Sequence, residues 1–317
     1  MGMHTGSQPA RVRTGVRGVV ERHPLAAFFV LANGFSWLAW LPYILSDNGL
    51  GVLDLRFPQL LGTDQLLGVL PGAYLGPVTA AFIVTAVADG RAGLRHWAAR
   101  LVRWRVSWRW YVGILTAVPV TVTLATLALP AAWQQFKAPT LIIVLGYVPM
   151  LIVQFFTTAV AEEPGWRDFA LPRLQRRFGA LAGTVVLGLL WGMWHLPLFV
   201  THWGGYPDVR WWQPLEFVLS CVPISLVMTW VFNRTRESLP MVMLLHASIN
   251  SVFSLVWPVM FPNLNSRDGS HVILIASTAG ALALLAATRG RLGLQVSHHD
   301  GRPSEHATTP EALQPAR

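Results

Sequence analysis

Eight apolar runs divide the chain, and each has about the length of a membrane-spanning helix. A helix that crosses roughly 30 Å of hydrocarbon at 1.5 Å per residue needs about 20 apolar residues. Segments that each carry at least one arginine or lysine separate the runs. The sequence therefore predicts an all-α, polytopic membrane bundle of about eight transmembrane helices, in the ranges 25–45, 66–88, 110–130, 140–161, 180–202, 215–233, 239–260 and 271–288.

The composition agrees with lipid as the surrounding medium. Charged residues make up 12% of the chain, against roughly 25% in a typical soluble domain, and hydrophobic residues make up 53%. The net charge of +9 is distributed between apolar runs and not gathered on one polar face, so we expect membrane lipid as a partner and no nucleic acid. The Arg- and Trp-rich segment 91–109 is interpreted as a cytoplasmic interfacial helix.

The basic residues also predict the orientation. Lys and Arg total 24, and 20 of them lie in segments that eight spans place on one side of the membrane. Because basic residues accumulate on the cytoplasmic side, both termini are expected there. This interpretation divides the chain into a basic cytoplasmic segment 1–24, a membrane domain 25–290 and a disordered cytoplasmic tail 291–317. The first apolar run is long enough to span and is expected to remain in the mature protein.

Two compositional details bear on location and redox chemistry. Arg outnumbers Lys by 23 to 1, which is typical of a GC-rich genome, so we expect a multi-pass protein of a bacterial plasma membrane. Cys221 is the single cysteine, which excludes an intramolecular disulfide, and it is interpreted as a small buried hydrophobic residue.

Ionisable side chains are rare within the predicted spans, and each one there suggests a function. Glu162 and Glu163 directly follow the fourth apolar run, and Pro164 is expected to end that span and begin a new helix. Both carboxylates would then lie near a helix N-terminus. Glu163 and Arg167, four residues apart, can pair, whereas Glu162 has no such local partner. The alternative is that both acids only offset nearby arginines at the interface.

Two histidines lie well inside other spans. Trp191 precedes His195 by one helical turn and can pack against its imidazole, and Pro197 should interrupt the helix next to it. His246 and Asn250, four residues apart, share a helix face, and their N–H groups could stabilise a developing oxyanion. The alternatives are a satisfied core histidine at 195 and a polar clamp between helices at 246.

Three motifs in this order resemble the CPBP family of intramembrane proteases, also called the Abi or CAAX-protease family. They are Glu162-Glu163 followed by Arg167, Trp191 four residues before His195, and His246 four residues before Asn250. The resemblance covers about residues 140–260. Trp191 stands where the family more often has Phe.

The resemblance implies an intramembrane endopeptidase that hydrolyses a peptide bond of a membrane-associated protein or peptide. Glu162 would be the general base, with His195 positioning the water and His246 and Asn250 binding the oxyanion. Glu163 and Arg167 would be a supporting pair, although the sequence leaves open which glutamate is the base. We expect no cofactor.

Three alternatives stay open from the sequence. Two histidines and a glutamate could hold a catalytic zinc ion, although no HExxH motif occurs. The bundle could serve as a noncatalytic scaffold or a bacteriocin-immunity-type protein that uses the same helices. A proton-coupled carrier is disfavoured because inverted repeats are absent from the sequence.

Overall fold

The computed structural model describes residues 15–130 and 132–294, and within these residues every regular element is a helix. The prediction of an all-α polytopic bundle is thus confirmed. The elements are α1 (Val16–Arg22), α2 (Pro24–Leu45), α3 (Gln65–Gly68), α4 (Leu70–Ala73), η1 (Tyr74–Val78), α5 (Thr79–Ala88), α6 (Gly90–Leu101), α7 (Trp108–Leu127), α8 (Ala132–Gln135), α9 (Leu141–Gln154), η2 (Phe155–Ala159), α10 (Val160–Glu163), η3 (Pro164–Ala170), α11 (Leu171–Trp194), η4 (Leu196–Val200), η5 (His202–Gly204), α12 (Trp212–Arg234), α13 (Leu239–Ser251), η6 (Val252–Val256), α14 (Trp257–Met260) and α15 (Ser266–Thr288).

Within the described residues, seven helical stretches are long and apolar enough to cross a membrane. Six of them match predicted spans to within four residues at each end. The seventh, Leu141–Val200, is 60 residues long and covers all but the outermost one or two residues of the fourth and fifth predicted spans. Gly179, with φ of 80°, bends the chain inside this stretch, where a residue with a side chain would be strained. The count of eight and the orientation stay predictions.

The expectation that Pro164 ends a helix is wrong. The helix continues from α10 through η3 into α11, and η3 is a π-helical segment that begins at Pro164. Wider i→i+5 turns change the hydrogen-bond register, so a proline without a backbone N–H can be accommodated inside the run. Glu162 and Glu163 therefore lie within a continuous helical run and not at a helix N-terminus.

The helical run is interrupted near Pro197, unlike at Pro164. Helix α11 ends at Trp194, and the chain continues through His195 into the short 3₁₀ helix η4, which contains Pro197. The interruption predicted next to His195 is therefore present. The histidine is the C-cap residue of α11.

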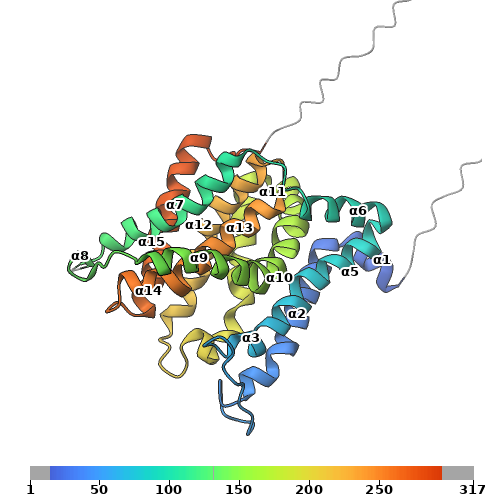
Figure 1. Cartoon of the computed structure of the whole chain (residues 1–317). Helices are drawn as coiled ribbons and strands as arrows, with labels where there is room; N and C mark the ends of the chain where they lie inside the picture. The colour runs from blue at the N-terminus through green and yellow to red at the C-terminus, as the bar shows by residue number, and fades with distance from the viewer. Residues whose placement is uncertain (1–14, 131, 295–317) are drawn as a thin grey trace, which may run out of the picture.

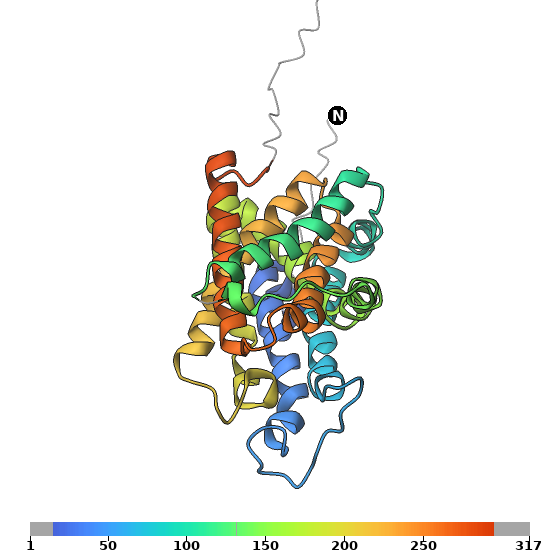
Figure 2. The same cartoon turned by 60° about the vertical axis from the view of Figure 1, so that its left-hand side comes forward.

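The helices pack as a bundle in which sequence-distant elements lie side by side (Figures 1 and 2). Helix α11 packs along α12, α12 along α15, and α13 against α7 and α9, while α2 packs on η1 and α5. Gly188 and Gly192 allow the close approach of α11 and α12. A Cβ at Gly192 would lie 2.8 Å from the Cα of Val218, and one at Gly188 would lie 2.7 Å from the Cα of Val222.

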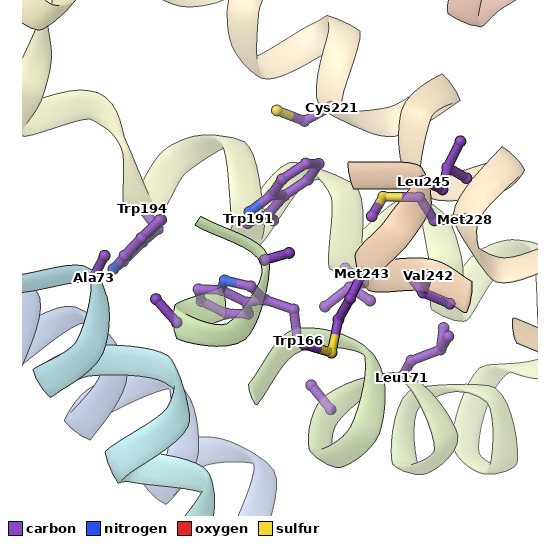
Figure 3. Packing of buried hydrophobic residues seen from close by; sticks show 14 of the residues in the cluster. Ala73, Trp166, Leu171, Trp191, Trp194, Cys221, Met228, Val242, Met243 and Leu245 are labelled. Atoms are coloured by element: carbon purple, nitrogen blue, oxygen red, sulfur yellow. The ribbon is translucent and has the colours of Figure 1, made fainter. Parts of the chain in front are cut away.

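The apolar surface is consistent with lipid around the bundle. On α9, Leu141 and Ile142 are 73% and 77% exposed, which is expected of side chains that face hydrocarbon. The bundle interior is enriched in large aromatic residues: Trp166, Trp191 and Trp194 gather where η3 and α11 meet, with the buried thiol of Cys221 nearby on α12 (Figure 3). The interpretation of Cys221 as a small buried residue is confirmed.

Helix α6 lies within the segment 91–109 that was interpreted as an interfacial helix. It is anchored to η3, because Trp97 donates its indole N–H to the Pro164 carbonyl over 3.1 Å and Arg100 pairs with Asp168 and with Glu237. The helix thus braces the segment that carries the acidic residues. Its position at a membrane surface stays a prediction.

The predicted terminal segments lie partly outside the described residues. Of segment 1–24, the described part begins at residue 15 and contains α1. Of segment 291–317, residues 291–294 are described, and there Leu292 is buried while its carbonyl accepts a hydrogen bond from Asn233 over 2.9 Å. The division of the chain into three parts stays a prediction.

Candidate active site

Glu163 is fully enclosed and connects two helices through one oxygen atom. Its Oε1 accepts a hydrogen bond from Arg167 Nη1 over 3.1 Å and another from His246 Nδ1 over 2.7 Å. Glu163 and Arg167 each have 0% of their surface exposed. The predicted pairing of these two residues is confirmed. The additional bond to His246 joins the helical run that carries Glu163 to α13.

Arg167 is held from three sides. Besides Glu163, its Nη2 lies 3.2 Å from Ser225 Oγ and 3.1 Å from the Met228 sulfur, both on α12. Its guanidinium carbon lies 4.1 Å from the centre of the Trp191 ring, a cation–π contact. The guanidinium is thus a fixed positive charge beneath the ring of Trp191.

Glu162 has a different environment from its neighbour. Its Oε2 accepts the indole N–H of Trp191 over 2.8 Å, and among the described residues no other side chain or amide hydrogen-bonds to this carboxylate. Glu162 is 4% exposed. One oxygen is therefore oriented by Trp191, while Oε1 is available to a water molecule or substrate.

Trp191 was expected to pack against His195, and its hydrogen bond to Glu162 was missed. The two ring centres lie 5.9 Å apart at an angle of 69°, so the packing prediction is confirmed. The sequence contained a signal for the missed bond: the indole carries a donor that the Phe more usual in the family lacks.

The hydrogen bonding of His195 defines which ring nitrogen carries the proton. Its Nδ1 lies 2.9 Å from the Trp191 carbonyl oxygen, and because a carbonyl only accepts, Nδ1 carries a proton. In the neutral ring Nε2 is then an unprotonated acceptor. Trp194, Trp203 and Phe217 surround the ring at centre distances of 4.5, 5.5 and 5.0 Å, with Trp203 stacked at 14°. The imidazole is thus held in one orientation within an aromatic enclosure.

The contact between Trp203 and His195 depends on a polar network that the sequence analysis did not identify. Asp64 Oδ2 accepts hydrogen bonds from His202 Nδ1 over 2.9 Å and from Asn48 Nδ2 over 2.6 Å. The His202 amide also donates to the Asn48 carbonyl over 2.8 Å. This network fixes η5, which contains Trp203. A segment distant in sequence therefore closes one side of the His195 enclosure.

His246 and Asn250 are placed by α13. Nδ1 of His246 is bound to Glu163, and the imidazole meets the Trp191 ring edge-on at 5.5 Å between centres. His246 is 6% exposed, and its Nε2 has no hydrogen bond with a described residue. Asn250 lies one turn further along and is half-buried, and its side-chain amide has no hydrogen bond with a described residue. These contacts do not test the prediction that Asn250 binds the oxyanion.

Trp191 is the common element of this arrangement. Glu162 bonds to its N–H, Arg167 lies over its ring, and both histidines contact its edge. The acid and the two imidazoles, which come from three helical segments, thus all contact Trp191. Within the described residues, no group of three or more His, Cys, Asp or Glu side chains is arranged to hold a metal ion. The expectations about cofactors stay predictions.

The fold and site define a class: a multi-pass, all-helical membrane protein with an enclosed cluster of glutamate, arginine and histidine. Residues 144–252 match the family described as type II CAAX prenyl endopeptidase Rce1-like, and this segment contains every predicted site residue. Over this segment the chain is similar to the CAAX-protease family that its motifs resemble.

A similar curated protein is CAAX prenyl protease 2 from Methanococcus maripaludis. The identity is 33% over 107 residues, which make up 33% of this chain and 39% of that protein. The chain thus matches about two-fifths of the length of this relative.

Proposed function

We propose that this chain is a CAAX-type intramembrane endopeptidase that hydrolyses a peptide bond of a membrane-associated protein with a glutamate-activated water. The observation that carries the proposal is the state of Glu162. One oxygen is oriented by Trp191 and the other is unengaged among the described residues, while two histidines whose Nε2 atoms have no described partner contact the same Trp191 ring. A general base needs this combination of fixed orientation and an available lone pair.

The same contacts support Glu162, and not Glu163, as the base. The Oε1 atom of Glu163 already accepts hydrogen bonds from Arg167 and His246, and the residue is completely enclosed. A carboxylate whose charge is compensated in this way has little capacity to take a proton from water. Glu163 is therefore assigned a positioning role, in which it holds His246.

The histidines have distinct roles in this proposal. His195 accepts a hydrogen bond from the attacking water at Nε2, because its Nδ1 proton is donated to the Trp191 carbonyl, while Glu162 takes the proton of that water. His246 and Asn250 bind the developing oxyanion, and donation from His246 Nε2 requires the doubly protonated ring. General-base catalysis contributes about 10²–10⁴-fold, and one oxyanion donor about 10²–10³-fold.

The substrate class follows from the family. The name of the Methanococcus relative specifies a CAAX prenyl protease. We extend this to the present chain as a substrate whose C-terminal segment is tethered to the membrane by a lipid. The reaction would release a short C-terminal peptide.

The test is cleavage of a farnesylated peptide ending in a CAAX sequence by the full chain reconstituted in lipid. Wild type should cleave it, and Glu162→Gln should not. Glu216→Gln is the matched control, because Glu216 is also a mostly buried glutamate bound to a histidine, His271 Nδ1 at 2.5 Å, outside the site. Equal cleavage by wild type and Glu162→Gln would overturn the proposal and leave the noncatalytic scaffold as the better account.

A further inference from the structure

An apolar cavity of about 490 Å³ lies between α7, α12, α13 and α15, apart from the cluster around Trp191. Its walls consist almost entirely of aliphatic and aromatic side chains and glycine. Residues at successive turns of α7 and α15 form two of these walls, among them Gly113, Ala117, Ala276 and Gly280. The volume is within the range of roughly 300–1,000 Å³ that is typical of small-molecule sites.

The lining chemistry restricts what can occupy this cavity. A peptide, a sugar or a nucleotide would bury polar groups without partners there, which is unfavourable. Of the few hydroxyl groups in the lining, that of Ser277 already donates to the Ile273 carbonyl over 2.7 Å. An alkyl chain has no such requirement. The walls therefore select a hydrocarbon chain.

The helices leave this space open and do not close over it. Small residues at four-residue spacing in membrane helices usually permit close helix contact. Here a Cβ added at Gly113 would meet no heavy atom within 4 Å, and one at Gly280 would meet only Val227, at 3.6 Å. The small residues thus widen a groove along α7 and are not buried in a helix–helix contact.

One end of the groove carries a positive charge. Arg109 lines the cavity next to Trp110 and is exposed, and its guanidinium has no ion pair or hydrogen bond with a described residue. From Arg109 to Thr121 the groove follows α7 for about 18 Å at 1.5 Å per residue. This is close to the thickness of one hydrocarbon leaflet, about 15 Å. Basic pockets between transmembrane helices are characteristic sites for anionic lipid head groups.

We propose that the α7–α15 groove binds one anionic phospholipid, with an acyl chain along Gly113 and Ala117 and the phosphate on Arg109. The positive charge at the mouth and the apolar walls below match the two parts of such a lipid. The site is independent of the proposed protease activity, since it uses no residue of the Trp191 cluster. Leu245 and Ile249 line it from α13 and flank His246 in sequence.

The test is native mass spectrometry of the full chain released from bilayers with equal amounts of phosphatidylglycerol and phosphatidylcholine. Wild type should retain one phosphatidylglycerol. Gly113→Leu fills the groove and should lose the bound lipid, whereas Gly34→Leu, on α2 and also with no heavy atom within 4 Å of an added Cβ, should retain it. Arg109→Gln should reduce the preference for phosphatidylglycerol by about fivefold, the effect of one basic residue near an anionic lipid.

Thermal unfolding of each variant checks that the bundle is intact, and Gly280→Leu fills the groove from the opposite wall if Gly113→Leu does not fold. Retention of the lipid by folded Gly113→Leu or Gly280→Leu would overturn the proposal. So would an unchanged lipid preference in Arg109→Gln, or a bound species that proves to be a free fatty acid. Each of these results leaves peptide cleavage untouched, so failure here is distinguishable from failure of the proposed activity.

Discussion

Trp191 donates its indole N–H to Glu162 Oε2 over 2.8 Å, so a residue of α11 orients the carboxylate of α10. Trp191→Phe keeps the ring and removes this donor. Because a hydrogen bond to a charged group contributes about 1.5–3 kcal/mol, we expect kcat for peptide cleavage to fall by about tenfold or more, with KM little changed. Steady-state kinetics in lipid measure both.

Trp212→Phe is the control for this substitution. Trp212 stacks on His271 outside the site, and its indole N–H has no hydrogen bond to a described residue. Its replacement should leave kcat unchanged. Wild-type turnover in Trp191→Phe would show that the indole N–H does not orient the base.

The buried Glu163–Arg167 pair should contribute strongly to stability. Arg167→Met leaves the carboxylate enclosed without its positive partner, and breaking a buried pair in this way costs about 3–5 kcal/mol. Denaturant unfolding in detergent measures the loss. Arg17→Met removes a pair of the same i,i+4 spacing whose side chains are 60% and 27% exposed, and it should cost about 0.5 kcal/mol or less. Equal losses of unfolding free energy in Arg167→Met and Arg17→Met would contradict a strong contribution of the buried pair to stability.

The helices and one ion pair of the site could be predicted from local sequence patterns. Apolar runs predicted the helices because each must cover the hydrocarbon thickness, and the i,i+4 spacing predicted the Glu163–Arg167 pair because residues four apart share a face. The path through Pro164 was not predictable in this way. A proline normally ends a helix, and the π-helical segment η3 that carries the run past it has no local sequence signal.

The other missed features depend on how helices rotate relative to one another. The bond between Glu162 and Trp191 joins residues 29 positions apart, and the contact between His246 and Glu163 joins residues 83 apart. Periodicity gives the face of each helix but not the partner it meets. The stacking of Trp203 on His195 depends further on a network around Asp64, which lies in a segment outside the family match.

Trp203 should act as a positioning residue for His195. Trp203→Ala removes the stacked ring, and because an aromatic contact contributes about 0.5–1.5 kcal/mol, cleavage should slow by up to about tenfold. The NMR signal of the His195 ring proton should also shift, since it loses the ring current of the indole. Trp203→Phe should restore most of the cleavage rate. As a control, Trp211→Ala, at an 85% exposed position, should change neither the cleavage rate nor the His195 signal. An unmoved His195 signal in Trp203→Ala would contradict the stacked arrangement.

Removal of metal ions should leave the activity intact, because the proposed reaction uses only side chains of this chain to activate water. Dialysis of the purified protein against a strong chelator, followed by the cleavage assay, measures this directly. Restoration of a lost activity by zinc would reverse the assignment. Glu162, His195 and His246 would then be metal ligands.

The most direct test of the account compares Glu162→Gln with Glu163→Gln under single-turnover conditions, with unfolding measured on the same samples. The single-turnover cleavage rate of Glu162→Gln should be lower than that of wild type by about 10²–10⁴-fold, while its unfolding should match that of wild type. Glu163→Gln should lose stability, because Arg167 and His246 lose their shared carboxylate. Retention of the wild-type cleavage rate by a folded Glu162→Gln protein would contradict the central claim that this carboxylate activates the water.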